Sequence, residues 1–395
     1  MSEIKKGPLH SPQTSRVVTI ATAHAAHDTY SAFLPPLLPV FIEKLSLVKA
    51  EAGLLTVFLQ GPSLLQPLIG HLGDRFDLRV AVILTPTLTA ACMSLLGIAP
   101  GYAVIALLLV TAGVSAAVLH SLAPVMAGRL SGHRLGYGMG FWMVGGELGR
   151  TFGPIILVSA IAILGFDGLP WLMVGGAGAS ALLYFGVRGT SQAHSGQAEA
   201  SNFSQAVRSM RNLVLPLSGV VVFRSFMMAA FATYLPVFLH EEGASLWFAG
   251  ASLSVLEAGG VFGALVGGSA SDRLGRRRVL VTSFLLTPVL MFALALTPGW
   301  WRLPMLLLLG FFGLMATPVI MASVQESAPA NRALVNGIYM ALNFVLRALI
   351  VVLVGALADQ LGMRSAFLAC AVIGLLGTPF IFRLPGRQGR DAVRD

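Results

Sequence analysis

Charge is scarce in this sequence. Asp, Glu, Lys and Arg make up 11% of the 395 residues, whereas hydrophobic residues make up 56%. An ordinary soluble domain carries roughly 25% charged residues, and a soluble chain of this composition could not cover its apolar surface. Cysteine is also rare. Cys92 and Cys370 lie in apolar stretches of different halves of the chain, which is typical of buried thiols rather than of a disulfide or a metal site. The composition therefore excludes a soluble domain and favours a membrane protein.

Two further sequence patterns are missing. Residues 1–16 are polar and do not follow the order of a cleaved signal peptide, so we expect the first apolar stretch to direct insertion. The chain has no Gly-x-x-x-x-Gly-Lys-Ser/Thr motif, which leaves ATP hydrolysis without support.

The apolar residues form twelve runs of about 20 residues, the length at which a helix crosses about 30 Å of hydrocarbon. The runs cover about residues 17–41, 51–71, 80–98, 101–126, 135–163, 168–188, 212–239, 246–269, 279–297, 302–325, 333–358 and 363–383. A segment rich in Ser, Gln, Ala and Gly separates the sixth run from the seventh. The sequence predicts an all-α membrane protein with an N-terminal tail at 1–16, a six-helix bundle at 17–188, a linker at 189–211, a second six-helix bundle at 212–384 and a C-terminal tail at 385–395.

Positive charge is distributed unevenly between the links. The 26 Lys and Arg residues, which give the chain a net charge of +9, lie mainly in the links on one side of the predicted spans. The positive-inside rule therefore predicts that both termini and the linker are cytoplasmic, in a bacterial-type inner (plasma) membrane. Because this topology signal accounts for the basic character, we expect no nucleic-acid partner.

Short motifs recur about 197 residues apart. The pattern Gly-x-x-x-Asp-Arg at 70–75 returns at 268–273, and Leu-Pro-Val-Phe at 38–41 returns at 235–238. Each copy occupies the corresponding place in its half, which indicates a duplicated membrane protein. Parallel repeats with a substrate site near the midplane are one of the designs of secondary transporters.

The repeated loop motif resembles the cytoplasmic signature of the major facilitator superfamily, which follows spans two and eight. The resemblance extends over about residues 17–384. It implies twelve transmembrane helices in two six-helix bundles related by pseudo-twofold symmetry, with spans one, four, seven and ten lining the substrate cavity. Asp77 departs from the family pattern, which favours glycine at that position.

The fifth run carries a second likeness. Residues 149–154 resemble the Gly-x-x-x-Gly-Pro motif of the antiporter branches, whereas Leu109 stands where many drug–proton antiporters carry an arginine. A generic multidrug mechanism is therefore disfavoured. The sequence is more similar to the fosmidomycin-resistance group, whose pattern is matched at 24–28, 66–70, His120 and 144–146.

The loop motif and the span-five motif contain the predicted gating residues. We expect the glycines to let helices approach closely, the aspartates to accept hydrogen bonds from the N-terminus of a neighbouring helix, and the arginines to stay on the cytoplasmic side. The alternative is a polar loop that only obeys the positive-inside rule. The predicted gating residues are Gly70, Asp74, Arg75, Gly268, Asp272, Arg273, Gly149, Gly153 and Pro154.

Ionisable residues inside the spans are the strongest functional signal, because a charge in hydrocarbon is costly unless it is paired or hydrated. The predicted proton-coupling residues are Asp28, Glu147, Glu257 and His27. For Asp28 and Glu257, the alternative is a permanent ion pair with an arginine. Glu147 and Arg150 lie three residues apart on the same helix face, so one alternative is that they form an ion pair with each other. The other is that one of them serves proton coupling and the other substrate binding. We expect His24 and His27 to relay protons or to pack as polar groups, and we expect no metal site.

Three arginines inside the spans predict an anionic substrate. Arginine cannot lose its proton, so these charges must face carboxylates or an anion. If one of the three acids is protonated during transport, the site becomes net positive and suits a phosphonate, phosphate or carboxylate. The alternative is a self-neutralising network with an uncharged or cationic substrate. The predicted substrate-binding residues are Arg150, Arg224, Arg347, Tyr30, His24, Asn343, Tyr234 and Trp142.

These observations together predict a monomeric, proton-coupled exporter (antiporter) of a small anionic organic compound or drug, working by alternating access. A symporter that imports an organic anion, a multidrug exporter of cationic or neutral lipophilic compounds, a membrane enzyme and a lipid flippase are the alternatives. We find no catalytic cluster for an enzyme and expect no cofactor. The expected partners are the substrate, protons and the lipid bilayer.

Overall fold

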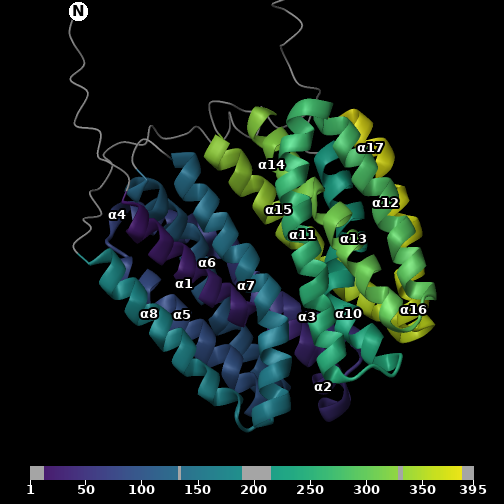
Figure 1. The fold of residues 1–395 in the computed structure, drawn as a ribbon, viewed down its shortest axis with the longest axis horizontal. Helices are drawn as coiled ribbons and strands as arrows, with labels where there is room; N and C mark the ends of the chain where they lie inside the picture. Colours follow the sequence, from purple (N-terminus) through teal and green to yellow (C-terminus); the bar gives the residue numbers. More distant parts are fainter. Residues whose placement is uncertain (1–12, 132–134, 189–214, 328–331, 385–395) are drawn as a thin grey trace, which may run out of the picture. The chain divides into compact units, whose positions relative to one another are not determined.

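The computed structural model describes residues 13–131, 135–188, 215–327 and 332–384. The α-helices are α1 (Thr14–Ser31), α2 (Leu34–Leu45), α3 (Lys49–Gln60), α4 (Gln66–Arg75), α5 (Arg79–Leu95), α6 (Tyr102–Leu130), α7 (Leu135–Leu164), α8 (Met173–Val187), α10 (Ala230–Glu241), α11 (Leu246–Leu274), α12 (Arg276–Leu296), α13 (Arg302–Leu314), α14 (Ala316–Ser327), α15 (Arg332–Leu361), α16 (Met363–Leu375) and α17 (Thr378–Arg383) (Figure 1). Residues 215–224 are also helical and continue into a π-helical turn, η4 (Ser225–Ala229). Short 3-10 turns are η1 (Gly61–Leu65), η2 (Leu96–Ile98), η3 (Leu169–Leu172) and η5 (Gly299–Trp301).

Eleven helical segments of the described chain are long and apolar enough to cross a membrane. They match the second to the twelfth of the predicted runs. The first predicted run is instead divided between α1 and α2 by a turn at Ala32 and Phe33. Pro35 and Pro36 are the second and third residues of α2, just after this turn. A proline lacks the backbone N–H, so Pro35 and Pro36 cannot donate helical hydrogen bonds to the carbonyl oxygens four residues earlier, which accounts for the break.

The chain forms two compact units. The first contains Met1–Phe33 and Pro62–Ser195, and the second contains Leu34–Gly61 and Gly196–Asp395. The predicted bundles and these units differ in one segment, because α2 and α3 pack with the second unit, where α2 lies beside α10 (Figure 1).

Hydrogen bonds explain why α3 belongs to the second unit. The amides of Lys49 and Ala50, at the start of α3, donate to the carboxylate of Asp359 at 2.7 and 3.1 Å. A carboxylate at this place satisfies free N–H groups of the helix and interacts favourably with its dipole. The hydroxyl of Tyr234, on α10, lies 2.9 Å from the carbonyl oxygen of Lys49 and 3.0 Å from that of Val351 on α15. Polar contacts from two helices therefore hold α3.

In the first unit, α1 lies against α7 along a line of glycines. An added Cβ on Gly145, Gly149 or Gly153 would come 2.3, 2.4 or 2.3 Å from a backbone carbonyl oxygen of α1. Any larger residue would push the helices apart, so glycine at every fourth position allows the two backbones to touch. Close approach of α1 and α7 is what brings their polar side chains together.

The second unit uses the same packing between α11 and α13. An added Cβ on Gly259 or Gly263 would lie 2.1 or 2.0 Å from a carbonyl oxygen of α13, and one on Gly267 would lie 2.3 Å from the carbonyl oxygen of Met315. Glycine-mediated helix contact is therefore a common feature of the two units.

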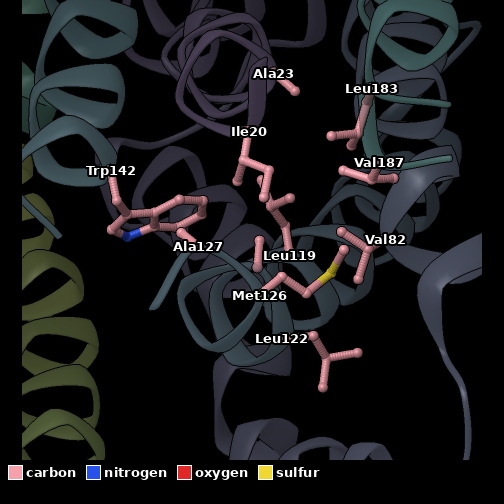
Figure 2. Packing of buried hydrophobic residues seen from close by; sticks show 11 residues of the cluster. Ile20, Ala23, Val82, Leu119, Leu122, Met126, Ala127, Trp142, Leu183 and Val187 are labelled. Atoms are coloured by element: carbon pink, nitrogen blue, oxygen red, sulfur yellow. The ribbon is translucent and has the colours of Figure 1, made fainter. Parts of the chain in front are cut away.

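A hydrophobic core lies in the first unit among α1, α5, α6, α7 and α8. Its buried residues are Ile20, Ala23, Val82, Leu119, Leu122, Ala123, Met126, Ala127, Trp142, Leu183 and Val187 (Figure 2). Because lipid tails are as apolar as these side chains, such a core stabilises a membrane protein through tight van der Waals packing. Trp142 and Ala23 border the polar residues of α1, so the core also supports the candidate site.

Candidate functional site

Asp28 lies at the centre of a buried polar cluster in the first unit, and its side chain is 5% exposed. Its Oδ1 is 2.9 Å from Nδ1 of His27 and 3.5 Å from Nε2 of His120. Its Oδ2 is 3.3 Å from Nε2 of His24 and 3.6 Å from Nη1 of Arg150. One carboxylate therefore faces three imidazoles and one guanidinium.

Three helices supply this cluster, and glycines on α7 make room for it. An added Cβ on Gly146 would lie 2.6 Å from the ring of His24, and one on Gly149 would lie 2.8 Å from Cβ of Asp28. The predicted gating residues Gly149 and Gly153 thus act as contact points between α1 and α7, and Pro154 follows them inside α7.

His120, on α6, is the cluster member that the predicted site residues omit. Its Nε2 lies 3.2 Å from Nε2 of His24, and the two rings meet edge to face with centroids 5.0 Å apart. Its side chain is 33% exposed, whereas His24 and His27 are buried. The sequence signal for His120 was its match to the fosmidomycin-resistance pattern. Its contact with Asp28 could not be predicted from residue spacing, because the two residues lie on different helices.

Trp142 orients His24. The two rings stack with centroids 3.5 Å apart and an interplanar angle of 12°, and Nδ1 of His24 lies 2.9 Å from the backbone oxygen of Trp142. The indole of Trp142, predicted to bind substrate, is buried in the hydrophobic core.

Arg150 and Glu147 form the ion pair that their spacing on α7 allows. Nη2 of Arg150 donates to Oε1 of Glu147, while Nη1 faces Asp28. The guanidinium therefore has two carboxylates beside it. The side chain of Arg150 is nonetheless 42% exposed, against 16% for that of Glu147.

A second polar group is centred on Arg224 in the second unit. Its Nη2 donates to Oγ1 of Thr317 at 2.6 Å, and Tyr339, a buried residue, is close enough to interact with its charge. The Nε of Arg224 is buried and has no hydrogen-bond partner among the described residues. Arg224 also directly precedes the π-helical turn η4, a geometry often found at functional sites. This group offers a fixed positive charge and an N–H donor for which the described residues provide no acceptor.

The other predicted site residues have varied surroundings. Glu257 on α11, and Asn343 and Arg347 on α15, are partly buried. The hydroxyls of Tyr30 and Tyr234 both donate to backbone carbonyls, the first to Leu172. Their polar ends are thus engaged in helix packing.

Within the described chain, one group of side chains has the dimensions of a metal site. His24, Asp28 and His120 each offer a ligand atom, and these atoms lie within 4.8 Å of one another. The sequence predicted no metal. The guanidinium of Arg150 already faces the same carboxylate, which places a positive charge beside that space.

Comparison with known proteins supports the fold. The model of the Major Facilitator Superfamily matches residues 20–269 and 250–394. The chain belongs to the Major Facilitator Superfamily.

Members of this superfamily resemble the chain over nearly its whole length. The fosmidomycin resistance protein of Escherichia coli (strain K12) is 25% identical over 378 residues, which cover 94% of this chain and 93% of that protein. The uncharacterized MFS-type transporter YfnC of Bacillus subtilis (strain 168) is 24% identical over 385 residues, with the same coverage.

Two solved structures share the fold. A bacterial homolog of the human lysosomal transporter Spinster, in an inward-facing and unoccupied conformation, matches with a TM-score of 0.77 and 15% identity, over 93% of this chain and 96% of that one. A D-xylose–proton symporter matches with a TM-score of 0.72 and 16% identity, over 95% of this chain and 98% of that one.

The predicted all-α membrane fold is confirmed. The protein is a multi-pass membrane transporter and not an enzyme.

The superfamily's loop signature lies at the ends of α4 and α11. The side chains of Asp74, Arg75 and Asp272 lie outside the described part of the structure, and Arg273 is exposed. The signature glycines do not show the expected close helix contact. Among described atoms, an added Cβ on Gly70 would meet nothing within 4 Å, and one on Gly268 would meet only a proline carbon at 3.9 Å. Close contact is made instead by the glycines of α7 and α11.

Proposed function

We propose that this transporter is a proton-coupled antiporter that exports a small anionic organic compound or drug by alternating access. The observation that carries the proposal is the carboxylate of Asp28, buried among three histidines on α1 and α6 and packed against α7. Both α6 and α7 contain segments long and apolar enough to cross a membrane. Imidazole is the side chain whose charge ordinarily changes between pH 5 and 8. An ionisable group inside a membrane protein is expensive to bury and is commonly part of a proton or substrate path.

The second polar group supports an anionic substrate. Arg224 keeps its charge throughout transport because guanidinium does not deprotonate in proteins. No described carboxylate forms an ion pair with it, and its buried Nε has no described partner. A phosphonate, phosphate or carboxylate accepts hydrogen bonds from guanidinium in a bidentate manner. We assign Arg347 and Asn343 on α15 to the same task, with Glu257 as a second proton carrier.

Export is favoured over import by two sequence relationships. Residues 149–154 carry the Gly-x-x-x-Gly-Pro pattern, and the curated relative from Escherichia coli is named for resistance to fosmidomycin. Resistance is most simply conferred by removing a compound from the cell.

We further propose that the protein works as a monomer in a bacterial-type inner membrane with both termini in the cytoplasm, since the basic links then obey the positive-inside rule.

Import by symport is the second candidate function. The D-xylose–proton symporter has a similar fold, and the same proton site serves either direction. A multidrug exporter of lipophilic cations is the third, and it requires the charge of Arg224 to be neutralised by the protein itself.

Proton flux in proteoliposomes tests the proposal. Purified protein is reconstituted with a pH-sensitive dye inside, and phosphonates, carboxylates, sugars, lipophilic cations and neutral drugs are added in turn. We expect proton movement with anions only, in the direction opposite to the anion, and its loss in Asp28→Asn. The matched control is Asp167→Asn, which changes an exposed loop acid and should retain the flux. Flux in the direction of the anion would establish symport, and flux driven by cations would overturn the anion assignment.

A further inference from the structure

The hydrogen bonds of His24 determine which of its nitrogens carries a proton. Its Nδ1 lies 2.9 Å from the backbone oxygen of Trp142. A carbonyl oxygen can only accept a hydrogen bond, so Nδ1 must be the protonated nitrogen. In a neutral imidazole the other nitrogen, Nε2, is then an acceptor with an exposed lone pair.

His120 is held in the same state by its own helix. Its Nδ1 lies 2.9 Å from the backbone oxygen of Ala116, one turn earlier on α6. The same argument assigns the proton to Nδ1 and leaves Nε2 as an acceptor in the neutral ring.

The two acceptors point at each other. Nε2 of His24 and Nε2 of His120 are 3.2 Å apart, a distance typical of a hydrogen bond. Two neutral rings in these orientations would oppose lone pair to lone pair beside the buried carboxylate of Asp28. One additional proton removes the conflict, because a protonated ring donates from Nε2 to its neighbour.

The carboxylate of Asp28 is a poor alternative location for that proton. A hydroxyl on Asp28 could donate to only one Nε2 and would leave the two nitrogens opposed. Oδ1 lies 2.9 Å from Nδ1 of His27, which donates to it when Asp28 is ionised, and Nη1 of Arg150 lies 3.6 Å from Oδ2. A carboxylate surrounded by donors and positive charge is stabilised in its ionised form.

We propose that the coupled proton resides on the His24–His120 pair, with Asp28 remaining ionised as its counterion. The inference rests on the proposed proton-coupled function and identifies the group that carries the proton. Asp28 then acts as a positioning residue, which holds the imidazolium and accepts a hydrogen bond from Nδ1 of His27. His120 is the more exposed of the two rings, so it is the end of the pair at which protons enter and leave.

The charged and titratable groups around the pair are consistent with one extra proton. α1 contributes His27 and Asp28, and α7 contributes Arg150 with its partner Glu147. One imidazolium and one guanidinium then face two carboxylates. A divalent metal ion in the same space would add a second positive charge within a few ångströms of the guanidinium, which Coulomb repulsion disfavours at low dielectric.

Loss of the proton supplies a reason for movement. With both rings neutral, the opposed lone pairs repel, and Asp28 loses its imidazolium partner. His120 on α6 and His24 on α1 must then separate or take up water. Proton release and a change of contact between these helices are therefore linked.

Nitrogen-15 NMR of histidine-labelled protein in lipid nanodiscs tests the inference without any transport assay. The imidazole nitrogen shifts distinguish neutral tautomers from imidazolium. We expect an imidazolium signal at neutral pH that disappears in His120→Gln and in His24→Gln but persists in His240→Gln. His240, on α10 of the second unit, lies 3.1 Å from the carbonyl oxygen of Ala244 and 3.0 Å from the carboxylate of Glu43, so it gives a separate imidazolium signal, which is assigned by its loss in His240→Gln. Two neutral rings together with an infrared band of a protonated carboxyl that is lost in Asp28→Asn would overturn the assignment. So would stoichiometric metal found by elemental analysis of the purified protein.

A flux measurement separates this inference from the proposed function. Glutamine at 120 can donate to His24 but cannot carry a proton, so His120→Gln should lose substrate-driven proton flux and retain substrate exchange between equal pools. Retained proton flux in both His120→Gln and His24→Gln would overturn the histidine assignment alone. Absence of flux in the unmodified protein with every substrate would overturn the proton-coupled function instead.

Discussion

The two units place different chemistry at equivalent positions. Residues about 197 apart in the duplicated sequence pair His27 with Arg224, His120 with Thr317, Trp142 with Tyr339, and Arg150 with Arg347. In the first unit, His27 and His120 both face Asp28. In the second, Arg224 donates to Thr317 and lies near Tyr339. Corresponding positions are thus in contact in both units.

The difference lies in which groups can change charge. The first unit collects imidazoles, whose charge ordinarily changes between pH 5 and 8, around a carboxylate that balances their charge. The second unit replaces them with a guanidinium and hydroxyls, whose charges stay constant over that range. The same duplicated arrangement of helices can therefore exchange protons in one unit and bind the charge of an anionic substrate in the other.

Substitution of Arg224 should have the largest effect, a loss of substrate binding. It tests whether proton coupling and anion binding are divided between the two units. Arg224→Ala should weaken anion binding by about ten- to a hundredfold, since a hydrogen bond to a charged group contributes about 1.5–3 kcal/mol. Arg224→Lys should recover only part of the affinity, because lysine keeps the charge and loses the planar fork. Equilibrium binding of the anion found in the flux panel measures both.

The matched control for that measurement is Asp28→Asn. If the units divide the work as described, Asp28→Asn leaves anion affinity near its original value while proton flux is lost. Equal loss of affinity in both variants would show that the two polar groups do not have separate tasks.

A second test concerns the glycine contacts that the units share. Gly149→Ala and Gly263→Ala should each lower stability by about 1–3 kcal/mol, because the added methyl meets a backbone oxygen and the helices must separate. Gly178→Ala on α8 is the control, since its Cβ would meet nothing within 4 Å. Unfolding in mixed micelles gives the free energies. A loss of stability in only one of the two variants would mean that close glycine contacts between helices stabilise only that unit.

The smallest effect is expected at Glu242, in the link between α10 and α11, which forms ion pairs with two arginines. Glu242 accepts from Arg364 at 2.6 Å and from Arg302 at 3.1 Å. Partial burial opposes ionisation of Glu242, but these hydrogen bonds outweigh it and lower its pKa below the usual 4.5. The ionised pair therefore stabilises the fold above about pH 4.5, and that contribution disappears as the pH falls through the lowered pKa.

Glu242→Gln measures this contribution in the same unfolding assay. At neutral pH the variant should be less stable by about 0.5–1.5 kcal/mol, the net contribution of a typical hydrogen bond, because glutamine keeps an oxygen acceptor for Arg364 and the buried Arg302. The difference from the unmodified protein should shrink as the pH is lowered from 5 toward 3. A difference that grows on acidification would contradict the assigned direction.

Much of the fold could be predicted because each relevant property is local. Apolar runs reveal spans, and Pro35 and Pro36 mark the place where the first span is interrupted. The ionisable residues of the candidate site were also recognisable one by one, since Asp28 and Arg224 interrupt apolar sequence. The pairing of Glu147 with Arg150 was one of two alternatives that their helical spacing left open, and the contact of Arg150 with Asp28 could not be predicted from that spacing.

Sequence alone determined that this chain spans a membrane as a duplicated helical protein and that it buries a small set of charges at high cost. Only the tertiary structure decided which of these groups meet. His120 reaches Asp28 because α1, α6 and α7 pack around it, and Tyr234 holds α3 because α10 and α15 meet there. The cost of a charge in hydrocarbon belongs to a single residue and can be read from its neighbours in sequence. The partner of that charge depends on the distance between helices. Contacts such as that of Gly149 with α1 set this distance, and they join residues more than a hundred positions apart in the chain.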